Sequence, residues 1–308
     1  MLSDQIFPDP LISERSSRYQ SLIGALVADA ATMGLHWMYD QDHIETISKS
    51  GDVLFRQPDA NNYKNRKSYF AHAAKSVGQN SQYGECVRVV AQVIRADGQY
   101  STSAHRDLFL QTFGPCGSYH GFADRPTKAL VAKIILEGDD IADASGSDDD
   151  QLPALCSIPA LFAYDQGSDS VEKAVSVTSI NTEAIGGARA LYNCLQRLHD
   201  GEGLAEALTA SASCAEPALS KLLIEALSKS TYDPLGVANH FGMPCHIKQG
   251  LPVAWHILKH ASDFESAVRD NIRCGGDSCG RSMAVGSVAA FVFGVPNEME
   301  VMLSSGAA

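Results

Sequence analysis

The stretch "CGGDSCGRSMAVGSVAAFVFG" (274–294) joins a glycine turn to a long run of small apolar residues. Gly275 and Gly276 permit positive φ angles and let other backbone segments approach closely. The small residues that follow have the character of a helix against which a second helix can pack at short distance. This stretch therefore predicts a tight turn aimed at a ligand, followed by a buried helix over 281–293.

The residues after the two glycines have the chemistry of a binding loop. Asp277 and Ser278 supply hard oxygen atoms, and a helix that begins near Gly280 offers free backbone N–H groups. Cys279 stands two positions after Asp277 and carries a soft thiol instead. On these residues alone the loop is either a ligand site or a glycine turn that leads into a core helix.

A second helix of small residues lies near the start of the chain, in "SLIGALVADAATMGLHW" (21–37). Asp29 stands among alanines there, and a buried carboxylate costs free energy unless it is paired or ligated. The alternative is that Asp29 lies on a polar edge or caps a neighbouring helix. His36, Trp37 and Tyr39 either line a ligand pocket or pack at the end of this helix.

A third candidate is "SVGQNSQYGECV" (76–87), in which Gly84 and Glu85 open a helix. A carboxylate in the first turn of a helix is favoured by the helix dipole, which is one explanation for Glu85. The other explanation is that Glu85 points into a cleft and serves a site.

Helical patterning dominates the rest of the chain, and strand-like alternation never persists beyond a few residues. The predicted helices cover 21–37, 84–96, 103–113, 125–136, 152–164, 171–178, 182–198, 203–212, 216–228, 249–260, 263–273 and 281–293. The polar, turn-rich segments 40–79, 137–150 and 231–250 are expected to be loops. We predict an all-α protein, with a flexible lead-in over 1–15, one compact domain over 16–300 and a tail over 301–308.

Composition excludes several classes of function. The chain has 308 residues, of which 45% are hydrophobic and only 7% aromatic, which favours close-packed helices over a sheet-rich fold. The net charge of -12 argues against binding to nucleic acid. The first twenty residues lack a secretory apolar region, and no uncharged run is long enough to span a membrane. We expect a cytoplasmic protein with no nucleic-acid or membrane partner.

The eight cysteines are scattered, which is unlike the disulfide framework of a small secreted domain. Cys245 and His246 with Cys274 and Cys279 match no common zinc-site spacing. Cys279 near a helix N-terminus could be a redox-active thiol with a lowered pKa, or it could be an inert packed thiol.

The order of the three motifs resembles that of the ADP-ribosylglycohydrolase superfamily across residues 20–294. "GALVADAATMG" (24–34) is similar to the family's glycine–acid–alanine helix, "YGEC" (83–86) to its Thr-Asp-Asp-Thr turn, and "GGDSC" (275–279) to its Gly-Gly-Asp-x-Asp loop. The resemblance implies an all-α orthogonal bundle. In active members two magnesium ions lie between the acidic pair and the final loop and help to cleave N- or O-glycosidic bonds of ADP-ribosylated groups.

This chain departs from that pattern at two of the four expected carboxylates. Gly84 stands in place of the first acid of the pair, and Cys279 in place of the last acid of the loop. A thiol is a poor ligand for Mg²⁺, so any magnesium site is weakened and no cofactor is assigned. "GALVADAATMGLHWMYD", "QYGE" and "GGDSCGR" are more similar to the J-crystallin branch, which includes soluble proteins of cnidarian lenses.

The resemblance thus implies a J-crystallin-like protein with a degenerate dimetal site, which is either a structural, lens-type protein or a ligand-binding protein. ADP-ribose or a related small molecule would be its ligand. The alternative is an active glycohydrolase with a remodelled site that holds at most one metal ion, with Glu85 or Asp277 as ligand or general base. The remaining candidate ligand-binding residues are Asp29, Gly275, Gly276, Ser278 and Cys279.

Overall fold

A computed structural model describes residues 16–303, which form α-helices joined by loops and short 3-10 helices. The predicted lead-in over 1–15 and the tail residues 304–308 lie outside the described part. Within residues 16–303 there is no β-strand, only isolated bridges, so the prediction of an all-α fold is confirmed. None of the helices in this range combines the length and the apolar character that crossing a membrane requires.

The first half of the chain forms α1 (Ser17–Thr32), α2 (Gln41–Ser50), α3 (Gln82–Asp97), α4 (Thr102–Phe113), α5 (Arg125–Glu137), α6 (Ile158–Ala163) and α7 (Asp169–Thr178). The second half forms α8 (Thr182–His199), α9 (Leu204–Ser211), α10 (Pro217–Ser228), α11 (Pro234–Phe241), α12 (Ile247–His260), α13 (Phe264–Arg273), α14 (Ser278–Phe293) and α15 (Asn297–Glu300). The 3-10 helices are η1 (Met33–Leu35), η2 (Ala60–Tyr63), η3 (Gly138–Asp140), η4 (Leu152–Leu155) and η5 (Ala212–Cys214).

Three local predictions were wrong. The predicted loop over 40–79 contains α2, whose apolar face is limited to two buried isoleucines and gives little periodic signal. The predicted loop over 231–250 contains the short helix α11, which begins at a proline. The predicted helix over 152–164 is divided into η4 and α6, because Pro159 has no N–H to continue the preceding turn.

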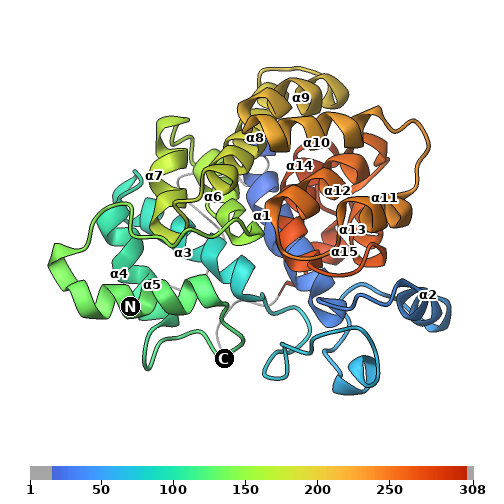
Figure 1. Ribbon diagram of the computed structural model, residues 1–308, viewed down its shortest axis with the longest axis horizontal. Helices are drawn as coiled ribbons and strands as arrows, with labels where there is room; N and C mark the ends of the chain where they lie inside the picture. The colour runs from blue at the N-terminus through green and yellow to red at the C-terminus, as the bar shows by residue number, and fades with distance from the viewer. Residues whose placement is uncertain (1–15, 304–308) are drawn as a thin grey trace.

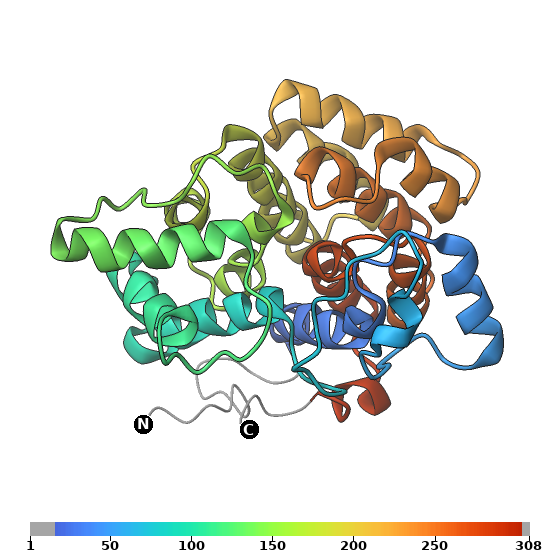
Figure 2. The same cartoon turned by 60° about the horizontal axis from the view of Figure 1, so that its bottom comes forward.

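Helix α1 lies at the centre of the molecule, with α3–α7 on one side and α9–α13 on the other (Figure 1). It packs along α14, as the second view also shows (Figure 2). A Cβ atom on Gly24 would lie 2.2 Å from the Cβ of Ala290, and one on Gly286 would lie 2.4 Å from the carbonyl oxygen of Gly24. The two backbones can therefore approach this closely only because both positions are glycine.

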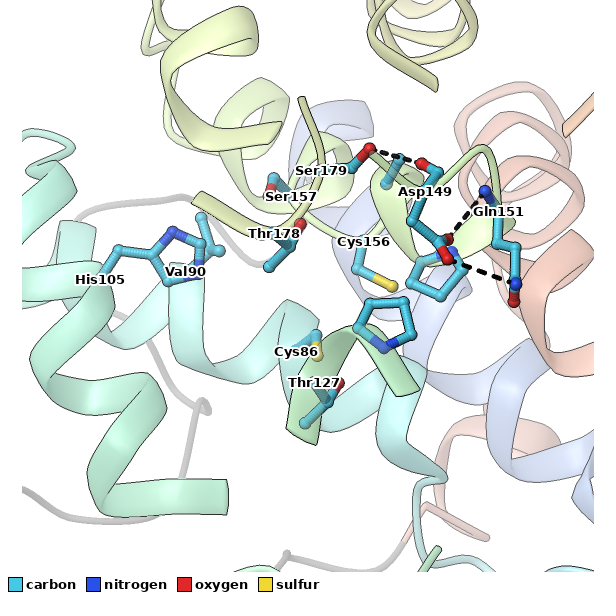
Figure 3. A pocket seen from close by; sticks show the side chains of 13 residues that line it. Cys86, Val90, His105, Thr127, Asp149, Gln151, Cys156, Ser157, Thr178 and Ser179 are labelled. Atoms are coloured by element: carbon cyan, nitrogen blue, oxygen red, sulfur yellow. Dashed lines mark hydrogen bonds between the residues drawn. The ribbon is translucent and has the colours of Figure 1, made fainter. Parts of the chain in front are cut away.

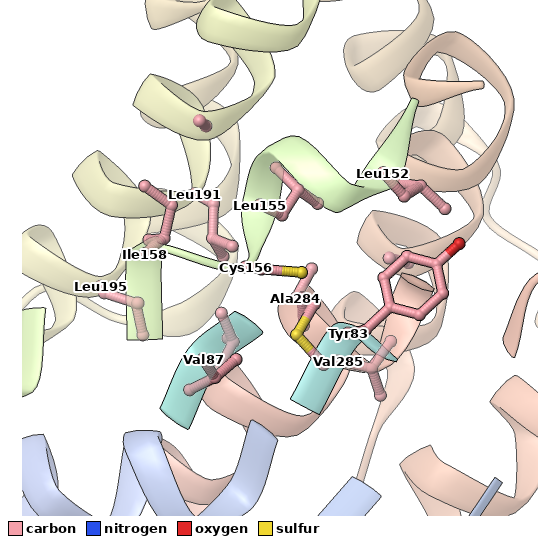
Figure 4. Close-up of a cluster of buried hydrophobic side chains, with 14 of the residues drawn as sticks. Tyr83, Val87, Leu152, Leu155, Cys156, Ile158, Leu191, Leu195, Ala284 and Val285 are labelled. Atoms are coloured by element: carbon pink, nitrogen blue, oxygen red, sulfur yellow. The ribbon is translucent and has the colours of Figure 1, made fainter. Parts of the chain in front are cut away.

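Around this helix pair, a buried apolar cluster joins the two halves of the chain (Figure 4). It combines Val87 of α3, Leu155 of η4, Leu191 of α8 and Val285 of α14, all of which are excluded from solvent. Full burial of one such aliphatic side chain contributes about 1.5–3 kcal/mol. Because α3 and α14 belong to this common core, their N-terminal ends are held in a fixed relation to each other.

The glycine contact between α1 and α14 generates a stability prediction. Gly286→Ala places a methyl group against the backbone of α1 and should lower the free energy of unfolding by about 3 kcal/mol, because the backbone cannot move aside cheaply. Urea unfolding followed by circular dichroism measures this change. Gly51→Ala is the matched control, since its Cβ would meet only Arg56 Nη1 at 3.7 Å and should alter stability by less than about 0.5 kcal/mol. Equal effects at the two positions would contradict the packing account.

Candidate functional site

The three motifs singled out from the sequence meet at one place in the fold. Helix α1 carries Asp29, the first turn of α3 carries Glu85, and the N-terminus of α14 carries Asp277 and Cys279. The hydroxyl group of Tyr83 donates a hydrogen bond to Asp277 Oδ2 at 2.8 Å, and Cys279 Sγ lies 3.8 Å from the backbone oxygen of Asp29. Residues 250 positions apart in the sequence are thus direct neighbours.

The glycine turn before α14 has the expected backbone conformation. Gly275 and Gly276 have φ angles of 74° and 67°, in the left-handed region that favours glycine. A Cβ atom on Gly276 would lie 2.2 Å from the carbonyl oxygen of Met243. The buried guanidinium group of Arg281 holds the turn by donating hydrogen bonds to the backbone oxygens of Gly275 at 2.6 Å and Asn271 at 2.9 Å. This turn fixes the direction in which Asp277 points.

Asp277 is fully buried and caps α14. Its Oδ1 accepts hydrogen bonds from the backbone N–H of Gly280 at 2.8 Å and from His36 Nε2 at 2.9 Å, while Oδ2 accepts the bond from Tyr83. Burial by itself raises the pKa of a carboxyl group, but here the hydrogen bonds and the neighbouring His36 outweigh burial and lower the pKa of Asp277. Asp277 is therefore ionised, and its charge is satisfied by protein groups.

Asp29 is also fully buried, so the alternative of a polar edge position was wrong. Its Oδ1 accepts a hydrogen bond from Ser81 Oγ at 2.5 Å, and its Oδ2 accepts bonds from Asn80 Nδ2 at 2.9 Å and from the Ser81 N–H at 2.8 Å. Burial dominates and raises the pKa of this carboxyl group. The expectation that a carboxylate in this helix must be paired is confirmed, and the partners are neutral groups that precede α3.

Two cationic side chains accompany Asp29 and Glu85. Burial lowers the pKa of Lys75 and of Arg88, and in both cases the charges of Glu85 and Asp29 oppose that shift. Arg88 donates two hydrogen bonds to Asn80 Oδ1, at 3.1 and 2.8 Å, and Lys75 Nζ lies 4.2 Å from the centre of the Tyr119 ring. The protein therefore supplies its own positive charge beside these two carboxyl groups.

Gly84 occupies a position that leaves no room for a side chain. A Cβ atom there would lie 2.5 Å from both Asn80 Nδ2 and Asp29 Oδ2. The side chain of Asn80 fills the space beside Gly84, so any larger residue at this position would require that side chain to move.

The described residues do not fit a dimagnesium centre. Mg²⁺ requires several hard oxygen ligands in a near-octahedral arrangement. The oxygens of Asp29 and Asp277 already accept hydrogen bonds within the protein, and both side chains are closed to solvent. Glu85, half-buried in the first turn of α3, is the remaining carboxylate of the predicted set.

Cys279 is fully buried at the second position of α14. Burial raises the pKa of its thiol well above the ordinary value, which favours the inert, packed thiol of the two alternatives. Thr32 Oγ1 donates a hydrogen bond to its sulfur at 3.5 Å.

Cys279 also belongs to a cluster with two histidines. One ligand atom from each of His36, His72 and Cys279 lies within 4.8 Å of the other two. His72 was missed by the sequence analysis, because it lies in a loop without periodicity or motif.

Aromatic side chains cover this cluster. The Trp37 ring stacks on His36 with 4.2 Å between centres, and it meets the edges of Phe122 at 5.0 Å and Tyr69 at 5.5 Å. His36 and Trp37 are buried, whereas Tyr69 is 54% exposed. Of the two alternatives for His36 and Trp37, packing describes their present state, with Tyr69 as the solvent-exposed member of the group.

A separate small cavity lies beside α3, between Cys86, His105, Thr127, Asp149 and Cys156 (Figure 3). Its volume of about 20 Å³ admits a single water molecule and excludes a nucleotide-sized ligand. Asp29, Glu85 and Asp277 are absent from its lining, so it is distinct from the site where the three motifs meet.

Comparisons with known proteins agree with the fold. A family model described as ADP-ribosylglycohydrolase matches residues 13–299. Crystallin J1A and Crystallin J1B of Tripedalia cystophora are 25% and 24% identical to the chain, over 89% of this chain and 87% of each relative. A solved structure titled "ADP-ribosylglycohydrolase-related protein complex" superposes with a TM-score of 0.65 at 15% identity, covering 94% of this chain and 96% of that chain.

The buried carboxyl group of Asp29 generates a prediction about pH. Its pKa is higher in the folded state than in the unfolded state, so the folded protein binds more protons between the two pKa values and loses stability as pH rises across that interval. Asp29→Asn removes this dependence. The stability of the variant relative to wild type should rise with pH by about 1.4 kcal/mol per unit over the interval, as measured by urea unfolding at a series of pH values.

Asp263→Asn is the control, because its stability relative to wild type should change with pH in the opposite direction. The backbone N–H of Ser266 holds the pKa of Asp263 below its usual value, so the wild type gains stability as pH rises through the acidic range. The stability of this variant relative to wild type should therefore fall with rising pH. A relative stability of Asp29→Asn that does not change with pH would show that Asp29 has an unshifted pKa.

Proposed function

Because the chain belongs to the ADP-ribosylglycohydrolase family, we propose that it keeps the fold of that family without its magnesium-dependent hydrolysis. Its role is that of a J-crystallin-like protein, either structural or a binder of ADP-ribose or a related small ligand. The similarity to two crystallins along most of the chain supports this choice of branch.

The observation that carries the proposal is that two cationic side chains lie where metal ions would supply positive charge in an active family member. Lys75 and Arg88 lie within electrostatic range of Glu85 and Asp29, in the region where the family pattern places its acidic pair. These two cationic groups weaken the attraction that Glu85 and Asp29 would exert on a pair of magnesium ions, because like charges repel. Gly84 is an independent argument, since it supplies no carboxylate and the Asn80 side chain packs against it.

The composition suits a protein held in solution at high concentration. A net charge of -12 opposes association between copies. The low aromatic content and the compact helical core are compatible with a structural role, and they are equally compatible with a binding protein.

Glu85 favours a second candidate function. It is the half-buried carboxylate of the predicted set, and Asp277 is ionised nearby. A remodelled hydrolase could use Glu85 as its general base, with one metal ion or none.

Two measurements on the full chain test these functions. Calorimetric titration with MgCl₂ should give no saturable heat, and ADP-ribosylated arginine and serine peptides should release no ADP-ribose above the rate without protein. The physical reason is that the carboxylates are buried, hydrogen-bonded or paired with cations. Titration with ADP-ribose alone then separates the ligand-binding role, which gives saturable binding, from the purely structural role.

Glu85→Gln decides between the two candidate functions. If the wild type releases ADP-ribose and Glu85→Gln reduces the rate by about 10²-fold or more, the remodelled hydrolase replaces our proposal. Lys128→Gln is the matched control, since Lys128 lies at the surface on α5 and its loss should leave any rate unchanged. If neither the wild type nor Glu85→Gln releases ADP-ribose faster than the reaction without protein, the proposal is supported.

A further inference from the structure

We propose that His36, His72 and Cys279 form a binding site for a zinc ion. All three side chains are buried, and a ligand atom of each lies within 4.8 Å of the other two. His36 Nδ1 and His72 Nε2 are only 2.7 Å apart. The three residues come from the segment after α1, from the loop before α3 and from the first turn of α14, so a bound ion would join three parts of the chain.

The ligand types are those that zinc prefers. Zinc binds imidazole nitrogen at about 2.0–2.1 Å and thiolate sulfur at about 2.3 Å, usually in a tetrahedral arrangement. Neighbouring ligand atoms of such a tetrahedron are about 3.3–3.6 Å apart, as follows from those bond lengths. The two histidine nitrogens would therefore separate by about 0.6 Å when the ion replaces the proton now shared between them.

Asp277 already orients His36 as a metal ligand. Its Oδ1 accepts a hydrogen bond from His36 Nε2 at 2.9 Å, so Nε2 carries a proton. In the neutral imidazole the lone pair is then on Nδ1, which faces His72. A metal-ligating histidine commonly donates its second N–H to a carboxylate in this way, which fixes its tautomer and ring orientation. Asp277 is itself held by Tyr83 and by the N–H of Gly280, so this support is rigid.

The local charges are also compatible with a zinc ion. Zinc deprotonates a coordinating thiol, and the N-terminus of α14 together with the hydroxyl group of Thr32 favours the resulting thiolate. The charges of the ion, one thiolate and the adjacent Asp277 carboxylate then sum to zero. The positive charge of Lys75, which acts on His72, is opposed by the negative charge of Glu85. By contrast, the three ligands include no carboxylate, so this site differs in chemistry from the dimagnesium centre that the chain lacks.

Three protein ligands leave one tetrahedral position for water or a small anion. Because the side chains are 0–3% exposed, an ion enters either during folding or when the loop before α3 opens. The site would hold this long loop, which contains little regular structure, against the α1–α14 pair. Zinc binding should therefore stabilise the folded chain, since the unfolded chain does not hold the three ligands together.

Cobalt is the probe for this site, because Co²⁺ bound to a thiolate shows a charge-transfer absorption in the near ultraviolet. The full chain is refolded from urea with Co²⁺, which gives the ion access to the buried cluster. We expect one equivalent of bound Co²⁺, the charge-transfer band, tetrahedral visible bands, and displacement by one equivalent of Zn²⁺. A wild-type chain that refolds and shows no such band overturns the proposal.

Substitutions test whether the charge-transfer band comes from Co²⁺ bound to these three residues. Cys279→Ser should abolish the charge-transfer absorption, and His72→Gln should weaken Co²⁺ binding at least about 10-fold. Cys274→Ser is the matched control, because Cys274 is buried in the same segment but lies outside the cluster, and its band should match that of the wild type. If Cys279→Ser fails to refold, as judged by circular dichroism, His72→Gln decides the question. A band that persists in Cys279→Ser, or an affinity unchanged by His72→Gln, places the metal elsewhere and overturns the proposal.

Discussion

The close approach of α1 and α14 is the constraint on which the rest of the structure depends. Gly24 and Gly286 lie against each other's backbones, and any side chain at either position would separate the two helices. Their contact brings the end of α1 beside the start of α14, where Thr32 meets Cys279. Several buried polar interactions at the centre of the molecule depend on this contact, because they join residues of these two helices to each other or to the start of α3.

The polar centre is closed by protein groups. Asp277 is satisfied by His36, Tyr83 and Gly280, and the neutral groups of Ser81 and Asn80 satisfy Asp29. In a hydrolase of this fold, metal ions would carry the positive charge. In this chain Arg88 and Lys75 bring positive charge near Glu85 and Asp29, and Asn80 fills the space beside Gly84. Buried acids are tolerated in a protein only when other groups supply their hydrogen bonds and oppose their charge.

The sequence predicted the fold class and the three segments of the site because these depend on local properties. Runs of small residues over 21–37 and 281–293 indicate helices that pack closely, and the paired glycines at 275 and 276 indicate a turn with positive φ. Helix α2 was missed because two isoleucines make too short an apolar stripe. His72, Lys75 and Asn80 were missed for a different reason, since they lie in a loop whose path is set by what it packs against.

The sequence by itself determined that the chain is all-α, that it belongs with the glycohydrolases in fold, and that Gly84 and Cys279 stand where acids would be expected. The fold class needs only residue types and their spacing, whereas the other two conclusions rest on the resemblance of the three motifs to those of the family. The tertiary structure alone decided which groups surround Asp29, Asp277 and Cys279, because several of their partners come from distant segments. The pairing of Asp277 with His36, the stacking of His36 on His72, and the burial of Cys279 all require side chains that are far apart in the chain to meet in one low-dielectric centre, where each charge must find a partner.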